Sequence, residues 1–150
     1  MVVRSWSVSS YYKAEYITTG AMKKILIVDD QAFIRQIFKQ LVNQIPEVEA
    51  LEADNGNAAL GKMRVTKPDL VLMDITMPGK DGLAVLQEMR ADPDLFEIPV
   101  IVISAHGDQK DHALEMGAKA FVNKVELNDI DIAGLIKQKL GMSASLSIGE

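Results

Sequence analysis

Five polar side chains stand at the ends of apolar segments of the sequence: Asp29, Asp30, Asp74, Ser104 and Lys124. If a fold brings them together, three carboxylates share one site. They repel one another unless a cation is bound or one carboxyl group keeps its proton. Oxygen ligands without Cys or His favour a hard cation such as Mg²⁺. A carboxylate beside Mg²⁺, with an ammonium and a hydroxyl opposite, has the nucleophile, the charge neutralisation and the donors that phosphoryl transfer needs.

Asp74 is the better candidate for the nucleophile among these residues. It ends the apolar run LVLM at 70–73 and leads into a loop, 76–82, that is punctuated by Pro and Gly. Asp29 and Asp30 follow an earlier apolar run directly, and we expect them to hold the metal.

Three of these residues also have an ordinary structural interpretation. Asp30 could cap the amino end of the following helix, which is the commoner role of Asp at such a position. Ser104 could be a turn residue, and Lys124 could be a solvated surface side chain. The chemical interpretation therefore depends on a fold that brings these side chains together.

Five apolar segments predict the strands of that fold: residues 25–28, 48–53, 70–73, 98–103 and 119–122. The segment 70–73 is apolar throughout and is bounded by turn residues. This pattern suits a strand that is buried on both faces of a parallel sheet.

A helical pattern follows each predicted strand. The first helix is expected to turn one apolar face inward, made of Ile34, Ile37, Phe38, Leu41 and Ile45, and to end at Pro46. Four more helices are expected near 58–64, 83–89, 111–116 and 132–140. Strands that alternate with helices predict an α/β fold, a doubly wound five-stranded parallel sheet with five helices. In the flavodoxin-like strand order 2-1-3-4-5, ligands bind at the carboxyl ends of the strands.

The composition excludes several classes of function. A chain of 150 residues that is 48% hydrophobic can form one domain with a core, but it is short for two. Its net charge of −5 argues against a nucleic-acid-binding surface. No apolar run approaches the roughly 20 residues of a membrane span. The absence of cysteine excludes disulfides and thiolate metal sites, which fits a cytoplasmic protein.

The sequence also predicts the boundaries of the domain. Residues 1–21 show no sustained periodicity, and we expect an irregular N-terminal extension. Met22, followed by two lysines and an apolar run, resembles a natural start. The domain is expected to span 22–141, and residues 142–150 are expected to form a flexible C-terminal tail.

The sequence resembles the receiver (CheY-like) domain of two-component response regulators. The matching segments are ILIVDD, ADNGNAAL, PDLVLMDITMPGKDGL, IPVIVISAHGD and MGAKAFVNK, which together cover essentially Lys23 to Gly141. No effector domain fits in the remaining residues, so we expect a stand-alone receiver. Its output would be contact with a downstream protein or relay to another phosphotransfer domain.

The resemblance implies a role for each candidate residue. Asp74 would accept a phosphoryl group from the phosphohistidine of a sensor histidine kinase or a phosphotransfer protein. Mg²⁺ would be bound directly by Asp30, Asp74 and the backbone carbonyl of Thr76, and mainly through water by Asp29. Such a domain is a signalling switch that catalyses its own phosphoryl transfer and hydrolysis, and it is not an enzyme acting on a separate substrate.

The resemblance also implies how the switch works. Lys124 would pair with the phosphoryl oxygens, and the Ser104 hydroxyl would move to donate a hydrogen bond to one of them. Phe121 matches the aromatic position that turns inward when that hydroxyl moves. The surface around Phe121 would then change for a downstream partner.

Three features depart from the family pattern. Val125 stands where the family usually has Pro after the lysine. We expect a trans peptide bond there, because a non-proline cis bond costs about 2.5–4 kcal/mol. The segment between Ser104 and Lys124 is slightly short, so the fourth helix is expected to be small or displaced. Ser104 replaces the commoner Thr and keeps the hydroxyl group.

Three other functions compete with the phosphoacceptor. A pseudo-receiver scaffold would bind partners without phosphorylation. A haloacid-dehalogenase-type phosphatase also has an Asp nucleophile at the end of a strand, but it needs a second acid two residues later, where this chain has Thr76. A nucleotide-binding Rossmann domain is the weakest alternative, because the first strand leads into Asp-Asp-Gln and not into a glycine-rich turn.

Overall fold

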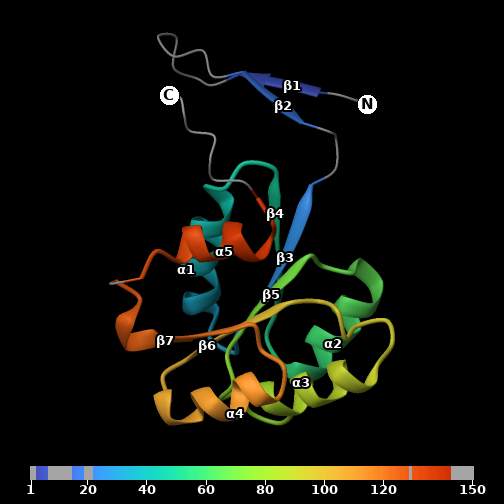
Figure 1. The fold of residues 1–150 in the computed structure, drawn as a ribbon, viewed down its shortest axis with the longest axis vertical. Helices are drawn as coiled ribbons and strands as arrows, with labels where there is room; N and C mark the ends of the chain where they lie inside the picture. Colours follow the sequence, from blue (N-terminus) through green and yellow to red (C-terminus); the bar gives the residue numbers. More distant parts are fainter. Residues whose placement is uncertain (1–2, 7–14, 19–21, 129, 143–150) are drawn as a thin grey trace.

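The computed structural model describes residues 3–6, 15–18, 22–128 and 130–142. Five strands form one parallel sheet (Figure 1): β3 (Lys23–Val28), β4 (Val48–Ala53), β5 (Leu70–Met73), β6 (Val100–Ser104) and β7 (Ala120–Asn123). Their order is β4-β3-β5-β6-β7. Numbered within this sheet, the order is 2-1-3-4-5, which confirms the predicted flavodoxin-like topology.

Five α-helices connect and follow the strands: α1 (Ala32–Asn43), α2 (Gly56–Thr66), α3 (Gly82–Ala91), α4 (Lys110–Glu115) and α5 (Ile132–Lys139). Two 3₁₀ turns, η1 (Gly107–Gln109) and η2 (Lys124–Glu126), follow β6 and β7. The helix α4 has only six residues, as its short sequence segment predicts.

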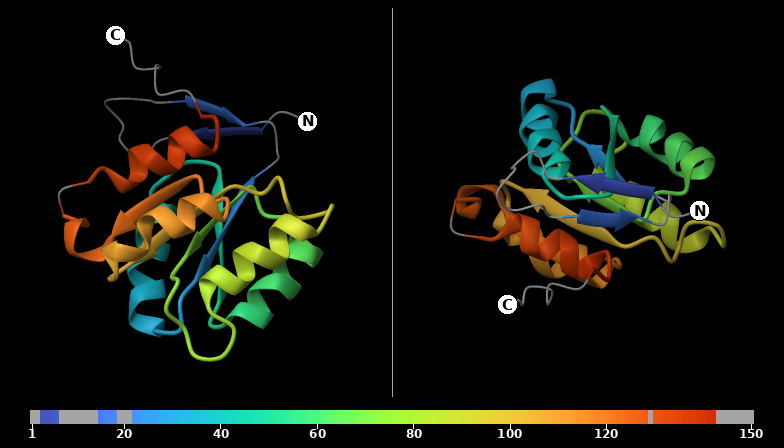
Figure 2. Two further views of the ribbon diagram at one scale, coloured as in Figure 1. Left: turned by 60° about the horizontal axis from the view of Figure 1, so that its bottom comes forward. Right: turned by 90° about the horizontal axis from the view of Figure 1, so that it is seen from above.

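The helices cover both faces of the sheet (Figure 2) and close two separate cores. One core joins the sheet to α2, α3 and α4, and the other joins it to α1 and α5. Successive residues of one strand alternate between them: Leu26 and Val28 lie in the first core, and Ile25 and Ile27 in the second. Because both faces are covered, the central strand β5 is apolar and buried over its whole length.

The buried face of α1 differs from the predicted one at Ile37. This side chain was expected to point inward, but it is 44% exposed, whereas Phe38 is 4% exposed and Val42 is fully buried. Phe38 and Val42 lie in the middle of the buried face of α1. Ile37 directly precedes Phe38, and successive residues of a helix are rotated by about 100° about its axis. Ile37 therefore lies on the edge of this face.

The N-terminal segment differs from the irregular extension predicted for 1–21. The structure describes two strands there, β1 (Val3–Trp6) and β2 (Glu15–Thr18), which pair antiparallel. Their sequences, VRSW and EYIT, carry β-branched and aromatic residues that favour strands. The rest of this segment, and all but the first residue of the expected tail at 142–150, lie outside the described residues. The domain boundaries stay a prediction.

None of the helices in the described part of the chain has the length and apolar character needed to cross a membrane.

The orientation of α1 gives a stability prediction. Ile37→Ala should lower the free energy of unfolding by less than about 1 kcal/mol, since full burial of such a side chain is worth about 1.5–3 kcal/mol and this one is half exposed. Phe38→Ala should lower it by about 3–5 kcal/mol, because it empties a core position. Urea unfolding of both variants measures the two losses. Equal losses would contradict the observed orientation of the helix.

Candidate functional site

Three carboxylates meet at the carboxyl ends of two adjacent strands. Asp29 and Asp30 follow β3, and Asp74 follows β5, which pairs directly with β3. Carboxylate oxygens of the three residues lie within 4.8 Å of one another. The chain thus gathers residues that are 45 positions apart because parallel strands end at the same edge of a sheet.

Lys124 is the cation of this cluster. It follows β7, and its Nζ donates to Asp29 Oδ2 at 3.1 Å and to Asp74 Oδ2 at 3.2 Å. One ammonium group is therefore shared by two carboxylates. The interpretation of Lys124 as a solvated surface lysine is wrong, since its side chain lies in the site.

Backbone amides orient the two buried carboxylates. Asp74 Oδ1 accepts a hydrogen bond from the Thr76 N–H at 3.1 Å, and Asp29 Oδ1 accepts one from the Gln31 N–H at 2.9 Å. Asp29 is 3% exposed and Asp74 is 7% exposed. Asp30 is exposed, and the N-cap of α1 is Gln31. The alternative role of Asp30 as a helix cap is therefore wrong.

Burial and charge act in opposite directions on the ionisable groups. Burial raises the pKa of Asp74, and the Thr76 amide and Lys124 only partly oppose it. Burial by itself lowers the pKa of Lys124, but the carboxylates of Asp74 and Asp29 outweigh this effect and raise it. The two shifts therefore have different main causes: burial for Asp74, and the attraction of two carboxylates for Lys124.

The cluster opens into a pocket of about 610 Å³. Asp30, Asp74 and Lys124 line its polar side, Thr76 also contributes, and Ile34 belongs to its apolar side. The predicted site residues other than Ser104 and Phe121 thus lie in or beside one opening. A group that enters it can approach the Asp74 carboxylate.

The described residues that line the pocket do not include Ser104 and Phe121. Ser104 is fully buried at the end of β6, and its Oγ accepts a hydrogen bond from the His106 N–H at 3.0 Å. Phe121 on β7 is partly buried and packs against the core formed with α2, α3 and α4. In this structure the serine hydroxyl is engaged with its own loop.

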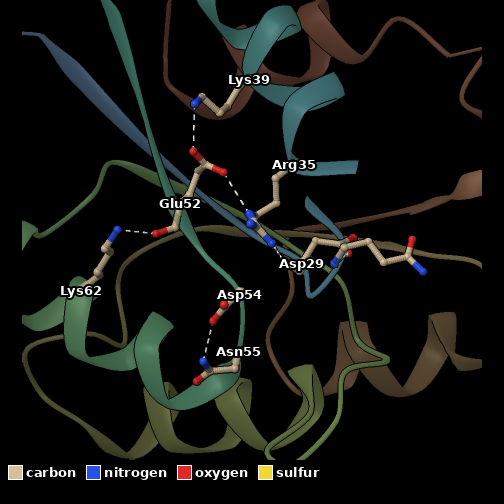
Figure 3. A network of polar contacts seen from close by, with 8 residues as sticks. Asp29, Arg35, Lys39, Glu52, Asp54, Asn55 and Lys62 are labelled. Atoms are coloured by element: carbon tan, nitrogen blue, oxygen red, sulfur yellow. Dashed lines mark hydrogen bonds and ion pairs between the residues drawn. The ribbon is translucent and has the colours of Figure 1, made fainter. Parts of the chain in front are cut away.

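An ion-pair network that sequence reasoning missed supports the end of β3 (Figure 3). Arg35 on α1 donates from Nη1 to the carbonyl oxygen of Asp29 at 2.7 Å and from Nε to Glu52 Oε1 at 2.9 Å. Lys39 donates to Glu52 Oε2 at 2.8 Å. Hydrogen bonds from Lys39 and Arg35 lower the pKa of Glu52. The sequence signal is weak, because an Arg one turn into a helix is common.

A second missed residue is Gly82, at the start of α3. A Cβ at this position would lie 2.5 Å from the backbone oxygen of Asp74 and 2.7 Å from Cα of Ile75. Its N–H donates to the Ile75 carbonyl at 2.8 Å. The glycine thus lets the helix begin directly against the backbone that carries Asp74. The sequence marks it only as the end of a Pro- and Gly-rich loop.

Comparison with known proteins gives consistent matches over the sheet and the site. A family model described as "Response regulator receiver domain" matches residues 25–134. Chemotaxis protein CheY of Thermotoga maritima is 42% identical over 105 residues, covering 68% of this chain and 85% of that protein. Protein-glutamate methylesterase/protein-glutamine glutaminase 1 of Syntrophomonas wolfei is 36% identical over 134 residues, which are 83% of this chain but only 37% of that relative.

A solved structure shares both the fold and part of the sequence. It is the response regulator protein TrrA from Thermotoga maritima, in complex with Mg(2+)-BeF. The TM-score is 0.70 at 31% identity, and the match covers 79% of this chain and 99% of that one.

The raised pKa of Asp74 predicts the effect of neutralising it. The folded state holds this proton more tightly than the unfolded chain, so stability falls as the pH rises from the usual Asp pKa through the raised one. At pH 8 in a chelator, Asp74→Asn should raise the melting temperature by about 2–4 °C, the shift that about 1 kcal/mol gives in a chain of this size. The gain should shrink as the pH falls toward the raised pKa.

Calorimetry between pH 8 and pH 5 makes this measurement, with Asp94→Asn as the matched control. Asp94 is exposed, and its substitution should leave the melting temperature unchanged. An Asp74→Asn variant that melts at or below the wild-type temperature at pH 8 would refute the prediction.

Proposed function

The chain belongs to the response regulator receiver domain family, and on that premise we propose that Asp74 accepts a phosphoryl group in two-component signalling. The donor would be the phosphohistidine of a sensor histidine kinase or of a phosphotransfer protein. One observation carries the proposal: Lys124 and two further carboxylates converge on Asp74 at the edge of a pocket. Asp29 is also buried and also pairs with Lys124, but it does not line the pocket of about 610 Å³ that Asp74 lines.

The residues of the cluster fit a divalent metal. Three carboxylates and one ammonium leave two negative charges, which a divalent cation would balance. The ligands are oxygen atoms, as Mg²⁺ prefers. Asp30, Asp74 and the Thr76 carbonyl would hold the ion directly, and Asp29 would act mainly through water. When bound, Mg²⁺ would neutralise charge on the phosphoryl oxygens.

The transfer itself needs little covalent chemistry from the protein. An oxygen of the Asp74 carboxylate attacks phosphorus, and the bond from phosphorus to the histidine nitrogen breaks. Lys124 would then pair with a phosphoryl oxygen in place of one carboxylate oxygen. Its positive charge, which balances carboxylates in the free protein, would balance the phosphoryl group in the product. Positioning and electrostatic stabilisation supply most of the rate.

The Ser104 hydroxyl is the group that would report phosphorylation. It now accepts from the His106 N–H, and it would turn to donate to a phosphoryl oxygen. Phe121, which pairs with Val102 two residues before Ser104 on β6, would move inward behind it. The surface around Phe121 would then change for a downstream protein target, by two packings of one core.

The proposal is limited to a signalling switch. This chain spans 37% of the methylesterase relative, whose activity belongs to that protein and is not proposed here. We propose a cytoplasmic location, and the net charge of −5 argues against nucleic acid as a partner. A scaffold that works without phosphorylation is the alternative that the first experiment below would detect.

Intact-mass spectrometry tests the phosphoacceptor function. Wild-type protein with Mg²⁺ and a small acyl-phosphate donor should gain one phosphoryl group, because Asp74 lines the pocket and Lys124 would balance the charge of the product. Asp74→Asn should gain none, chelation should prevent labelling, and Asp94→Asn should label as wild type does. If wild type stays unlabelled where a known receiver labels, and also fails to trap beryllofluoride, the function is that of a scaffold.

A metal titration tests the ligand set separately. Mg²⁺ at about 100 times its dissociation constant should stabilise the wild-type protein by about 2.7 kcal/mol. Asp30→Asn removes one negative ligand, so it should lose most of this gain at the same Mg²⁺ concentration. Thermal unfolding with and without Mg²⁺ measures the gain. An undiminished gain in the variant would mean that the ion binds elsewhere.

A further inference from the structure

We propose that Asn123 is a positioning residue for Lys124, and that its side-chain amide joins the loop after Ser104 to the lysine. The inference rests on the proposed function, because it assigns Asn123 to the placement of the cation that balances Asp74. Nothing in the charge pattern of the sequence marks this residue. Its role follows from contacts on both sides of its amide.

The carbonyl side of the amide closes a turn around Lys124. Asn123 is the last residue of β7, and its Oδ1 accepts a hydrogen bond from the Val125 N–H at 3.1 Å. This bond spans Lys124 and starts η2. A side-chain oxygen that bonds the amide two residues later holds the intervening backbone in one conformation.

This turn depends on the residue that departs from the family pattern. Proline at position 125 would have no N–H to donate, whereas Val125 has one. The peptide bonds of the described residues are all trans, including the one between Lys124 and Val125. Asn123 therefore fixes the lysine backbone by a hydrogen bond that a Lys-Pro sequence would lack.

The amino side of the amide packs against the neighbouring loop. A Cβ placed on Gly107 would lie 2.7 Å from Asn123 Nδ2, which is closer than real Cβ contacts. The strand register sets Asn123 beside Ser104, so the two loops leave the sheet next to each other. The amide thus fills the space between the Ser104–Gly107 segment and the turn at Lys124.

The consequence concerns the reach of the lysine. Its Nζ donates to Asp29 and Asp74 from a backbone that leaves the sheet directly after Asn123. Lys side chains have many rotamers, and loosening the backbone adds conformers that miss one or both carboxylates. Loss of the amide should slow phosphoryl transfer, but it leaves the carboxylates that would hold Mg²⁺ in place.

Four variants test this role: Asn123→Ala, Asn123→Ser, Gly107→Ala, and the double variant Asn123→Ala/Gly107→Ala. Asn123→Ala should slow phosphorylation by acyl phosphate about 10- to 100-fold, the range that misplacement of a reacting group produces. Its Mg²⁺ affinity should stay within a factor of two or so of wild type, because no metal ligand changes. Asn123→Ser keeps a side-chain acceptor and should recover part of the rate.

The double variant is the sharpest arm of the experiment. Gly107→Ala alone should also slow the reaction, because its methyl group displaces the amide. Added to Asn123→Ala, it should have no further effect, since the space is then free. Additive losses from the two substitutions, or an Asn123→Ala rate equal to that of wild type, would overturn the proposal. The proposal would also be overturned if Asn123→Ala lowered the Mg²⁺ affinity and the melting temperature along with the rate.

A readout without phosphorylation separates this inference from the proposed function. The Val125 amide hydrogen should exchange with solvent faster in Asn123→Ala and in Gly107→Ala than in wild type, as measured by NMR. Unchanged exchange in both variants would refute the link between Asn123 and Lys124. Faster exchange in a protein that takes up no phosphoryl group would keep the link and refute the phosphoacceptor function.

Discussion

The site depends on one ammonium group that two buried carboxylates share. Lys124 Nζ lies 3.1 Å from Asp29 and 3.2 Å from Asp74, and neither carboxylate has it alone. Removing charges from water is costly, and a pair recovers this cost only when the geometry is good and the remaining lone pairs are bonded. Here the remaining oxygens accept backbone N–H groups, but a third carboxylate, Asp30, leaves the cluster negative. This excess of negative charge makes the cluster receptive to a cation.

The covered parallel sheet makes such a cluster possible, because it brings the polar ends of its strands to one edge. Both faces of the sheet are covered, so the inner strands β5 and β6 are apolar up to their carboxyl ends, and the polar groups of the site stand at or after those ends. Close approaches then fix the ends themselves. Gly82 lets α3 start against the Asp74 backbone, and Arg35 holds the Asp29 carbonyl while Glu52 holds Arg35. On the far side, Asn123 links Lys124 to the loop after Ser104.

Sequence reasoning succeeded where a property is local. The length of each apolar run marks the strand ends, and strand ends in a parallel sheet share one edge, so the cluster of Asp29, Asp30 and Asp74 could be predicted before any contact was known. It failed where the outcome depends on a distant partner. The spacing of apolar residues in α1 could not show that Ile37 lies at the edge of the buried face and is 44% exposed. No local pattern tells that the Asn123 amide meets Gly107, because that contact depends on how two loops leave adjacent strands.

The most direct test of the account is to locate the phosphoryl group on the chain. After phosphorylation with Mg²⁺, borohydride reduction converts an aspartyl phosphate to homoserine, and tandem mass spectrometry of the peptides then reads its position. The account predicts homoserine at position 74 and at no other aspartate. Homoserine at position 29 or 30 would contradict it, because the acceptor would then be one of the carboxylates that are proposed to hold Mg²⁺.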